Sequence, residues 1–480
     1  MSSKVNIRKL ATGVPGMDDL LGGGVPEFSF NLIAGVPGSG KTTLAHQMMF
    51  SLASPTCKAL FFTVLGEPPL KMLRYQQQFP FFDVDKINTS IRYVNLAADL
   101  LEGDFDQILQ RIYREVRDFS PSLVFVDSFR SVVQSPQNAG GNTHALQHFV
   151  QQLGLKMTSW QATTFLIGEY MAPEAESSPI FTVADGIFWI SQVVHRDSMV
   201  RKIQVVKIRG QSQKLGLHTF RIASTGIEVF PRVIFDSKAT QITGDKRVSL
   251  GVPALDDMLG GGLPAAYAML LVGPSGSGKT ILATQFLAEG VRVGEPGVIA
   301  AFEKSPNQLL SHKLNQLVTR GEVGLIDTRA LDLSIDEILH DLMAMITRMG
   351  AKRVVIDSLS GFEVALASVF RENFRESLYR LVAVLTGMGV TVLMTSELED
   401  RYTDLRFSSY ANAFLADAIV MQRYVELQGQ FRRVISVVKV RASAHSKDIR
   451  FYDIEHGQLR IEDKPVPFSS VLLGHTVEQY

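Results

Sequence analysis

The stretches GVPGSGKT at residues 35–42 and GPSGSGKT at residues 273–280 decide the fold of this 480-residue chain. Both fit the pattern G-x-x-x-x-G-K-[ST], in which glycines let consecutive backbone N–H groups turn toward a di- or triphosphate. Each stretch follows an apolar run, at residues 28–34 and 267–272, and each opens a helical pattern. A strand, a glycine-rich loop and a helix are the context that the motif requires, so we expect two nucleoside triphosphate sites.

These two phosphate loops supply the residues that we expect to bind nucleotide. In such a loop the lysine ammonium lies between the β- and γ-phosphates, and the threonine hydroxyl completes the shell of Mg²⁺. The expected binding residues are Gly38, Ser39, Gly40, Lys41, Thr42 and Thr43 in the first loop, and Gly276, Ser277, Gly278, Lys279, Thr280 and Ile281 in the second. ATP and Mg²⁺ are therefore the expected cofactors.

The chain is duplicated well beyond the loops. Residues 12–26 (TGVPGMDDLLGGGVP) and 250–264 (LGVPALDDMLGGGLP) agree at ten of fifteen positions. The repeat distance is far longer than the roughly 20–50 residues of a solenoid unit, so it indicates two homologous domains. We expect these domains at residues 1–240 and 241–480, joined near the polar stretch 237–246.

Composition excludes several classes of protein. Lysine plus arginine equals aspartate plus glutamate at 48 each, so net charge gives no argument for nucleic acid or a membrane surface. The single cysteine, Cys57, excludes an internal disulfide framework and suits a reducing cytosol. Residues 1–13 lack the apolar core of a signal peptide, and no apolar stretch approaches a transmembrane span. We expect a soluble, cytoplasmic protein.

Apolar runs rich in valine, isoleucine and phenylalanine alternate with helical patterns in each half. They lie at 59–64, 123–126, 164–167, 186–190 and 203–208, and again at 298–302, 353–356, 390–395, 418–422 and 434–440. This alternation predicts an α/β fold whose mostly parallel sheet is covered by helices, with ligands at the carboxyl ends of the strands. The last runs of each half lack a long helix between them, so we expect an antiparallel hairpin at one edge.

Each half also has an apolar strand that ends in aspartate, LVFVD at Asp127 and RVVID at Asp357. Such a carboxylate anchors the hydration shell of Mg²⁺ beside a phosphate loop, although an isolated one is often a turn or cap residue. The recurrence in both halves favours the metal site. We expect Thr42 with Asp127, and Thr280 with Asp357, to bind Mg²⁺.

Hydrolysis needs a further carboxylate, which polarises the attacking water beside the γ-phosphate. Glu67 and Glu303 follow the strand after each loop helix, in the segments VLGEP and AFEKS. A glutamate at a strand end commonly faces solvent and does nothing more, but both halves place one at about the same spot. We therefore expect Glu303 and Glu67 to be the catalytic bases.

Basic residues near the end of each half form another matched set. The segments VVKIRG and VVKVRA place Lys207 with Arg209, and Lys439 with Arg441, on one face of a strand. Such cations could line a solvated edge. Their repetition favours a role at a neighbour's nucleotide, where they neutralise γ-phosphate charge as an arginine finger does. This interpretation predicts a site completed between subunits, and hence a protein that assembles.

Taken together, these residues give a chain that resembles the KaiC family of two-domain, RecA-like ATPases, known from the cyanobacterial circadian clock. The resemblance covers nearly the whole chain, from the G-V-P openings and phosphate loops to the Asp-Ser strand ends and Lys-x-Arg pairs. It implies two tandem RecA-like P-loop NTPase domains and a double-ring homohexamer, with ATP between adjacent subunits. Lys207, Arg209, Lys439 and Arg441 fall on the family's trans-acting residues.

The catalytic glutamates are one departure from the family pattern. The family's clock proteins carry two adjacent glutamates in each half, whereas this chain has Gly66-Glu67 in the first and Glu303-Lys304 in the second. If the first glutamate of the pair is the true base, the first half is expected to be the weaker hydrolase.

Autophosphorylation is the other departure. The clock proteins place a Ser-Thr phosphoacceptor pair four and three residues before the aspartate that corresponds to Asp417. This chain has Ala413 and Phe414 there, and neither accepts phosphate. Ser408 and Ser409 lie slightly upstream and could substitute. The departure bears on a clock role and leaves the ATPase role intact.

We therefore predict a cytoplasmic, Mg²⁺-dependent, homohexameric ATPase of regulatory type, with an unidentified regulatory protein as a further partner. One alternative is a Ser/Thr autokinase that phosphorylates its own subunits, and another is a nucleotide-stabilised scaffold with little turnover. A RecA-like nucleic-acid motor is the alternative from a different class, and it would favour a basic loop facing the ring axis. Residues 135–142 are polar but uncharged, and residues 371–380 carry enough acidic residues to form a solvated helix.

Overall fold

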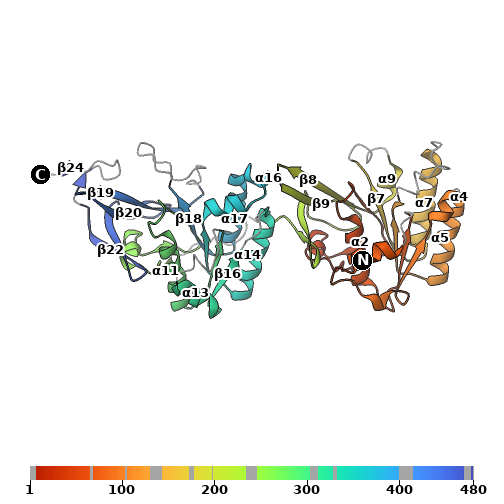
Figure 1. Cartoon of the computed structure of the whole chain (residues 1–480), viewed down its shortest axis with the longest axis horizontal. Coiled ribbons are helices and arrows are strands. Elements are labelled where there is room, and N and C mark those ends of the chain that lie inside the picture. Colours follow the sequence, from red (N-terminus) through yellow and green to blue (C-terminus); the bar gives the residue numbers. More distant parts are fainter. Residues whose placement is uncertain are drawn as a thin grey trace, which may run out of the picture. The chain divides into compact units, whose positions relative to one another are not determined.

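The computed structural model describes residues 7–64, 69–102, 105–129, 143–171, 178–196, 198–233, 246–302, 312–327, 332–398, 415–466, 468–469 and 477–478. By its internal contacts the chain divides into two units, residues 1–194 with 199–232 and residues 195–198 with 233–480. Each unit has a central sheet with helices packed against it (Figure 1). Across the described residues, no helix combines the length and apolar character that crossing a bilayer requires.

The first unit contains a sheet of nine strands. They are β3 (Phe30–Gly35), β4 (Ala59–Thr63), β5 (Ile91–Asn95), β6 (Leu123–Asp127), β7 (Thr163–Glu169), β8 (Gly186–His195), β9 (Ser198–Ile208), β10 (His218–Ala223) and β11 (Gly226–Phe230). Their order is β11-β10-β9-β8-β3-β7-β6-β4-β5. The strands from β8 to β5 in this order pair in parallel, whereas β9, β10 and β11 pair antiparallel with one another.

Helices of the first unit cover both faces of this sheet. They are α1 (Met17–Leu20), α2 (Lys41–Leu52), α3 (Pro69–Gln76), α4 (Ala97–Glu102), α5 (Phe105–Phe119), α7 (Thr143–Ser159) and α9 (Pro179–Val183), with a 3-10 turn at Val84–Lys86 and a small ladder of β1 (Lys9–Leu10) and β2 (Val25–Pro26). Strand β3 is buried along its whole length. Leu32 packs with residues of α5 and α7, and Ile33 packs with α2 on the opposite face.

The second unit repeats the sheet. Its strands are β14 (Ala268–Gly273), β15 (Gly297–Ala301), β16 (Val323–Asp327), β17 (Arg353–Asp357), β18 (Thr391–Glu397), β19 (Ala418–Leu427), β20 (Gln430–Val440), β21 (Ile449–Glu455) and β22 (Gln458–Pro465). Their order is β16-β15-β17-β18-β14-β19-β20-β21-β22. Read from β5 to β11, the order of the first unit matches it strand for strand. Smaller ladders pair β12 (Arg247–Val248) with β13 (Leu263–Pro264), and β23 (Phe468–Ser469) with β24 (Val477–Glu478).

Helices of the second unit are α10 (Pro253–Met258), α11 (Lys279–Arg292), α13 (His312–Thr319), α14 (Ile335–Met349), α15 (Leu359–Ala365), α16 (Ser368–Arg371) and α17 (Phe374–Gly387). Local sequence explains their ends. Helix α14, for example, begins with a capping box between Ser334 and Glu337, and it ends at Gly350, which has the left-handed backbone (φ 64°) that favours glycine.

The predicted α/β fold with mostly parallel, helix-covered sheets is therefore confirmed in both halves. The expected edge hairpin is wrong in its position. Strands β19 and β20 do pair antiparallel, but β21 and β22 extend the sheet beyond them, so β20 is an inner strand. The outermost strand β22 is mostly exposed and polar, as edge strands commonly are, and it therefore lacks the apolar run used to recognise strands.

Candidate functional site

Both phosphate loops lie at the carboxyl end of the strand that forms the middle of the sheet. Strand β3 ends at Gly35 and helix α2 begins at Lys41, so the loop between them is short. Gly38 and Gly40 have φ values of 70° and 106°, a left-handed backbone that side chains other than glycine rarely adopt. In the second half Gly276 and Gly278 repeat this geometry at 77° and 99°.

The loop threonines contact the strand-terminal aspartates. Thr42 Oγ1 donates a 2.6 Å hydrogen bond to Asp127 Oδ2, and Thr280 Oγ1 donates one of 2.8 Å to Asp357 Oδ2. These aspartates end β6 and β17, which the sheet order places near β3 and β14. The peptide bond after each aspartate is cis. The structure thus brings together, in both halves, the hydroxyl and carboxylate that the sequence paired.

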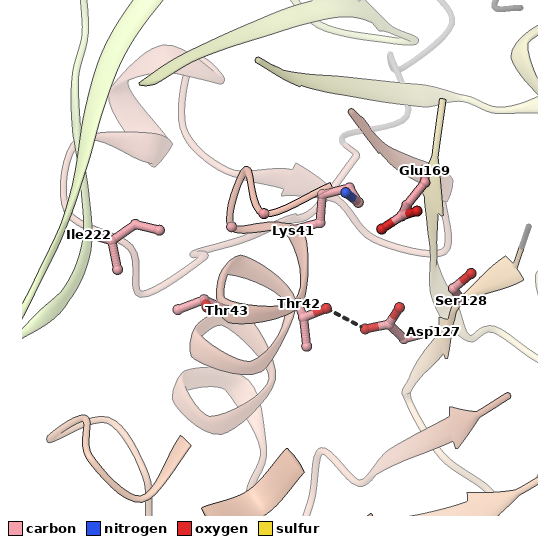
Figure 2. Close-up of a pocket in the computed structure, with 9 residues that line it drawn as sticks. Lys41, Thr42, Thr43, Asp127, Ser128, Glu169 and Ile222 are labelled. Atoms are coloured by element: carbon pink, nitrogen blue, oxygen red, sulfur yellow. Dashed lines mark hydrogen bonds between the residues drawn. The ribbon is translucent and has the colours of Figure 1, made fainter. Parts of the chain in front are cut away.

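A pocket of about 360 Å³ lies at the first loop. Figure 2 shows the Thr42–Asp127 hydrogen bond on one side of it and Lys41 on the other. The pocket is lined by Gly38, Gly40, Lys41, Thr42, Thr43, Asp127, Ser128, Glu169 and Ile222. Most of the predicted binding residues of the first loop therefore face one hollow.

Charges in this pocket are perturbed by burial. Burial lowers the pKa of Lys41, against the opposing effect of the negative charges of Glu169 and Asp127. Burial also raises the pKa of Asp127 to about 6, although the hydrogen bond from Thr42 acts in the opposite direction. Lys41 Nζ donates to the carbonyl of Val36 across 2.7 Å. A cation and carboxylates held in one partly buried hollow suit a polyphosphate with its metal ion.

Glu169 is a pocket residue that the sequence interpretation missed. It ends β7, in register with Gly35 at the start of the loop, and its carboxylate lies toward Lys41 in Figure 2. The second half has Glu397 at the end of β18, in register with Gly273. A comparison of the two repeats could have found this matched pair of acidic strand ends, TTFLIGE and TVLMTSE.

The Lys-x-Arg pair of the first half lies outside the pocket at the phosphate loop. Neither Lys207 nor Arg209 lines the first pocket; Lys207 Nζ donates to the Thr182 carbonyl at 3.0 Å, and Arg209 Nη1 pairs with Asp185 at 2.9 Å. The second half matches this arrangement. Burial and the adjacent arginine charge lower the pKa of Lys207.

In the second half, Lys439 Nζ donates to the Ala416 carbonyl at 2.9 Å, and Arg441 Nη1 pairs with Asp417 at 2.9 Å. Burial and the charge of Arg441 lower the pKa of Lys439. Both arginines are exposed. The four basic residues are thus held by contacts within their own chain, and the guanidinium groups of Arg209 and Arg441 are accessible from outside.

Several sequence predictions fall on residues outside the described ones. These are the catalytic bases Glu67 and Glu303, the acceptor positions Ser408, Ser409, Ala413 and Phe414, and the stretch 135–142. The stretch 371–380, expected to be a solvated helix, covers the end of α16 and the start of α17. Its Arg371, Glu372, Arg375 and Glu376 are exposed, whereas Arg380 pairs with Asp336.

Comparison with known proteins gives a consistent family. A family model for the KaiC ATPase matches residues 10–234 and again residues 248–466. A circadian clock oscillator protein KaiC from Picosynechococcus sp. is 27% identical over 482 residues, which cover 98% of this chain and 92% of the relative. KaiC 1 from Synechocystis sp. gives the same three figures. KaiC from Prochlorococcus marinus is 26% identical over 487 residues, covering 98% and 96%.

Proposed function

The chain belongs to the KaiC family of P-loop ATPases, and from this premise we propose that both halves bind and hydrolyse MgATP within a regulatory homohexamer. The observation that carries the proposal is the duplicated contact between a loop threonine and a strand-terminal aspartate, Thr42 with Asp127 and Thr280 with Asp357. A hydroxyl and a carboxylate beside a phosphate loop are the protein groups that a Mg-nucleotide site uses, so this contact supports such a site in each half. We propose the domain limits 1–240 and 241–480 for these halves, and a cytoplasmic location.

The loop residues would bind the phosphates. The backbone N–H groups from Gly38 to Thr43 and from Gly276 to Ile281 would surround the β-phosphate, and Lys41 and Lys279 would bridge to the γ-phosphate. Lys279 Nζ now donates to the carbonyls of Gly273 and Pro274 at 2.8 and 2.9 Å. An ammonium that already lies over its own loop needs to move little to meet a phosphate.

The oxygen groups present fit magnesium. Mg²⁺ prefers hard oxygen ligands and usually takes one or two from protein, and each half offers a hydroxyl and a carboxylate in direct contact. Thr42 with Asp127, and Thr280 with Asp357, would hold it directly or through water. When bound, the ion neutralises charge on the β- and γ-phosphates.

We assign the hydrolytic step to the glutamates of the sequence prediction. Glu303 in the second half and Glu67 in the first would take a proton from the water that attacks the γ-phosphorus, and ADP would leave. Lys207, Arg209, Lys439 and Arg441 would neutralise phosphate charge at the adjacent subunit's nucleotide. The exposure of Arg209 and Arg441, and the partial exposure of Lys207 and Lys439, support this trans role, because a neighbour could reach them.

Turnover of the purified chain tests the proposal. With Mg²⁺ and ATP the chain is expected to release phosphate, and the double variant Lys41→Ala with Lys279→Ala is expected to release none. Mass spectrometry of the same samples separates the autokinase alternative, because transfer to protein adds a phosphoryl mass. A chain that releases no phosphate yet binds ATP would instead be a nucleotide-stabilised scaffold.

A further inference from the structure

The two phosphate loops are anchored differently at their central serine. Ser39 and Ser277 occupy the same motif position, two residues before the lysine, and both are buried. In the second half Ser277 Oγ donates to Gln422 Oε1 at 3.0 Å, and the Ser277 carbonyl accepts from the Tyr452 hydroxyl at 2.7 Å. Both bonds are buried, so strands β19 and β21 hold the loop at one residue.

The first loop lacks both anchors. In the first half, Ile190 on β8 pairs with Gly35 at the end of β3. In the second half, Gln422 on β19 lies against Gly273 at the end of β14, so Ile190 occupies the position of Gln422. Phe220 on β10 pairs with Arg201 on β9, and Tyr452 on β21 pairs in the same way with Arg433 on β20. The first half therefore has phenylalanine where the second has Tyr452. Among the described residues, Ser39 Oγ is buried with no hydrogen-bond partner. A buried hydroxyl without a partner is costly, and the first loop tolerates one.

The apolar packing around the loops does not differ in this way. Ile222 Cδ1 lies 2.8 Å from the position that a Cβ of Gly40 would take, and Ile454 Cδ1 lies 2.8 Å from that of Gly278. Strand β10 in the first half and strand β21 in the second thus approach their loops equally closely at these isoleucines. This apolar contact is thus the same in both halves, whereas the polar anchors of Ser39 and Ser277 differ.

Holding the Ser277 carbonyl also fixes a phosphate-binding group. The peptide unit between Ser277 and Gly278 is planar and trans, so its C=O and N–H point in opposite directions. The Tyr452 bond therefore directs the Gly278 N–H away from Tyr452 and restrains rotation of the unit. An N–H group that is already oriented loses less conformational freedom when a phosphate binds.

The metal carboxylate shows the same contrast independently. Asp357 accepts a second hydrogen bond on Oδ1, from Thr395 Oγ1, in addition to the bond from Thr280. The corresponding residue beside Asp127 is Ile167, which has no polar group to offer. Three polar residues that brace the second site are thus apolar in the first, and all three lie on strands of the sheet.

We propose that Gln422 and Tyr452 are positioning residues that pre-organise the second phosphate loop, and that Ile190 and Phe220 leave the first loop to release nucleotide faster. The proposal rests on nucleotide binding by both loops, as proposed above. One net hydrogen bond in a protein corresponds to about a fivefold change in an equilibrium constant. Loss of either anchor is therefore expected to speed nucleotide release from the second loop about fivefold.

Release of N-methylanthraniloyl-ADP from the full chain tests this. In a Lys41→Ala background, which leaves the second loop as the binding site, Gln422→Ile and Tyr452→Phe are each compared with the parent. Tyr379→Phe is the matched control, because it removes the same hydroxyl from an exposed side chain. We expect faster release in both test variants, a higher KM for ATP with little change in kcat, and an unaltered control.

The reciprocal exchange separates positioning from damage. In a Lys279→Ala background, Ile190→Gln with Phe220→Tyr is expected to slow release from the first loop, which a merely disruptive change would not do. Release rates that match the control in both backgrounds overturn the proposal, as does faster release that only follows a fall in melting temperature. If the unmodified chain binds no fluorescent ADP, nucleotide binding itself fails, which is a different result from binding that the anchors do not affect.

Discussion

Arg441 Nη1 donates a 2.9 Å hydrogen bond to Oδ1 of Asp417, the residue just before β19. The other carboxylate oxygen of Asp417 accepts from the backbone N–H of Ala268, at the start of the strand that leads into the second phosphate loop. One aspartate thus joins the proposed trans-acting arginine to the strand that carries its own chain's loop.

The first half repeats this junction. Arg209 pairs with Asp185 at 2.9 Å, and Asp185 Oδ2 accepts from the N–H of Phe30 at the start of β3. Ion pairs as exposed as these contribute about 0–1 kcal/mol. Each arginine can therefore leave its aspartate for a neighbour's phosphate at little cost.

Removing either loop lysine should weaken assembly as well as nucleotide binding. Lys41→Ala and Lys279→Ala each delete the ammonium that bridges the β- and γ-phosphates. If only the assembled state binds ATP between subunits, ATP stabilises the hexamer by mass action, and losing a site removes that contribution. Sedimentation velocity with and without ATP measures this. Full hexamers of both variants in the absence of nucleotide would contradict the link between binding and assembly.

Glu303→Gln should preserve ATP affinity and assembly but slow turnover by about 10²–10⁴-fold at its site. The amide keeps the shape of the side chain and cannot accept the proton of the attacking water. Phosphate release by Glu303→Gln, Glu67→Gln and the double variant measures the share of each half. Normal turnover in the double variant would place the base elsewhere, and Glu169 and Glu397 would be the next residues to replace.

The first site should lose magnesium affinity in mild acid. Because burial raises the pKa of Asp127 to about 6, a proton occupies the carboxylate below that pH and competes with the metal. In a Lys279→Ala background, the Mg²⁺ needed for half-maximal binding of fluorescent ATP should rise about tenfold per pH unit below 6. Asp127→Asn is the control: its amide does not bind this proton, so the remaining pH dependence of its metal requirement comes from the protonation of ATP. A metal requirement with the same pH profile in both proteins would contradict the assignment.

Fully buried His46 should make the first half sensitive to acid. Burial lowers its pKa to about 4, while Nδ1 donates to the Thr42 carbonyl at 2.8 Å. The unfolded chain binds this proton near pH 6.5 and the folded chain does not, so stability is lost as pH falls from about 6.5 toward 4. The full loss is about 3 kcal/mol.

His46→Thr is the matched variant, because Thr284 Oγ1 makes the equivalent bond to the Thr280 carbonyl in the second half. Urea unfolding of both proteins at several pH values isolates the histidine, since other groups, including Asp127 with its opposite effect, are common to both. The stability difference between them should change by about 3 kcal/mol from pH 7 to 4. A constant difference would contradict a buried neutral histidine.

Much of this arrangement could be predicted from local sequence. The loop motif fixes its own glycine conformations and its strand and helix, and the aspartates at the ends of apolar strands follow because parallel strands present their carboxyl ends at one edge. The contact of Thr42 with Asp127 is thus predictable although 85 residues separate them.

Other contacts depend on sheet order, which no local pattern specifies. Gln422 and Tyr452 meet Ser277 only because β19 lies beside β14, and β21 folds back over the loop. In the first half, Glu169 lies in the pocket because its strand β7 pairs with β3, the strand that leads into the loop. The edge strand β22 was not predicted from the sequence because its residues are mostly polar and exposed and form no apolar run.

A subunit-mixing experiment tests the central claim, that each ATPase site is completed by a neighbouring chain. Arg441→Ala lacks the trans-acting arginine and Glu303→Gln lacks the base, so neither protein alone should hydrolyse ATP in its second half. Phosphate release is measured after the two are mixed, with Glu67→Gln in both to silence the first half without weakening assembly. Recovery of activity is predicted, because some interfaces then combine an intact Glu303 with an intact Arg441. A mixture that exchanges subunits, as shown by fluorescence transfer between labelled chains, and yet stays as inactive as its parents would contradict the shared site.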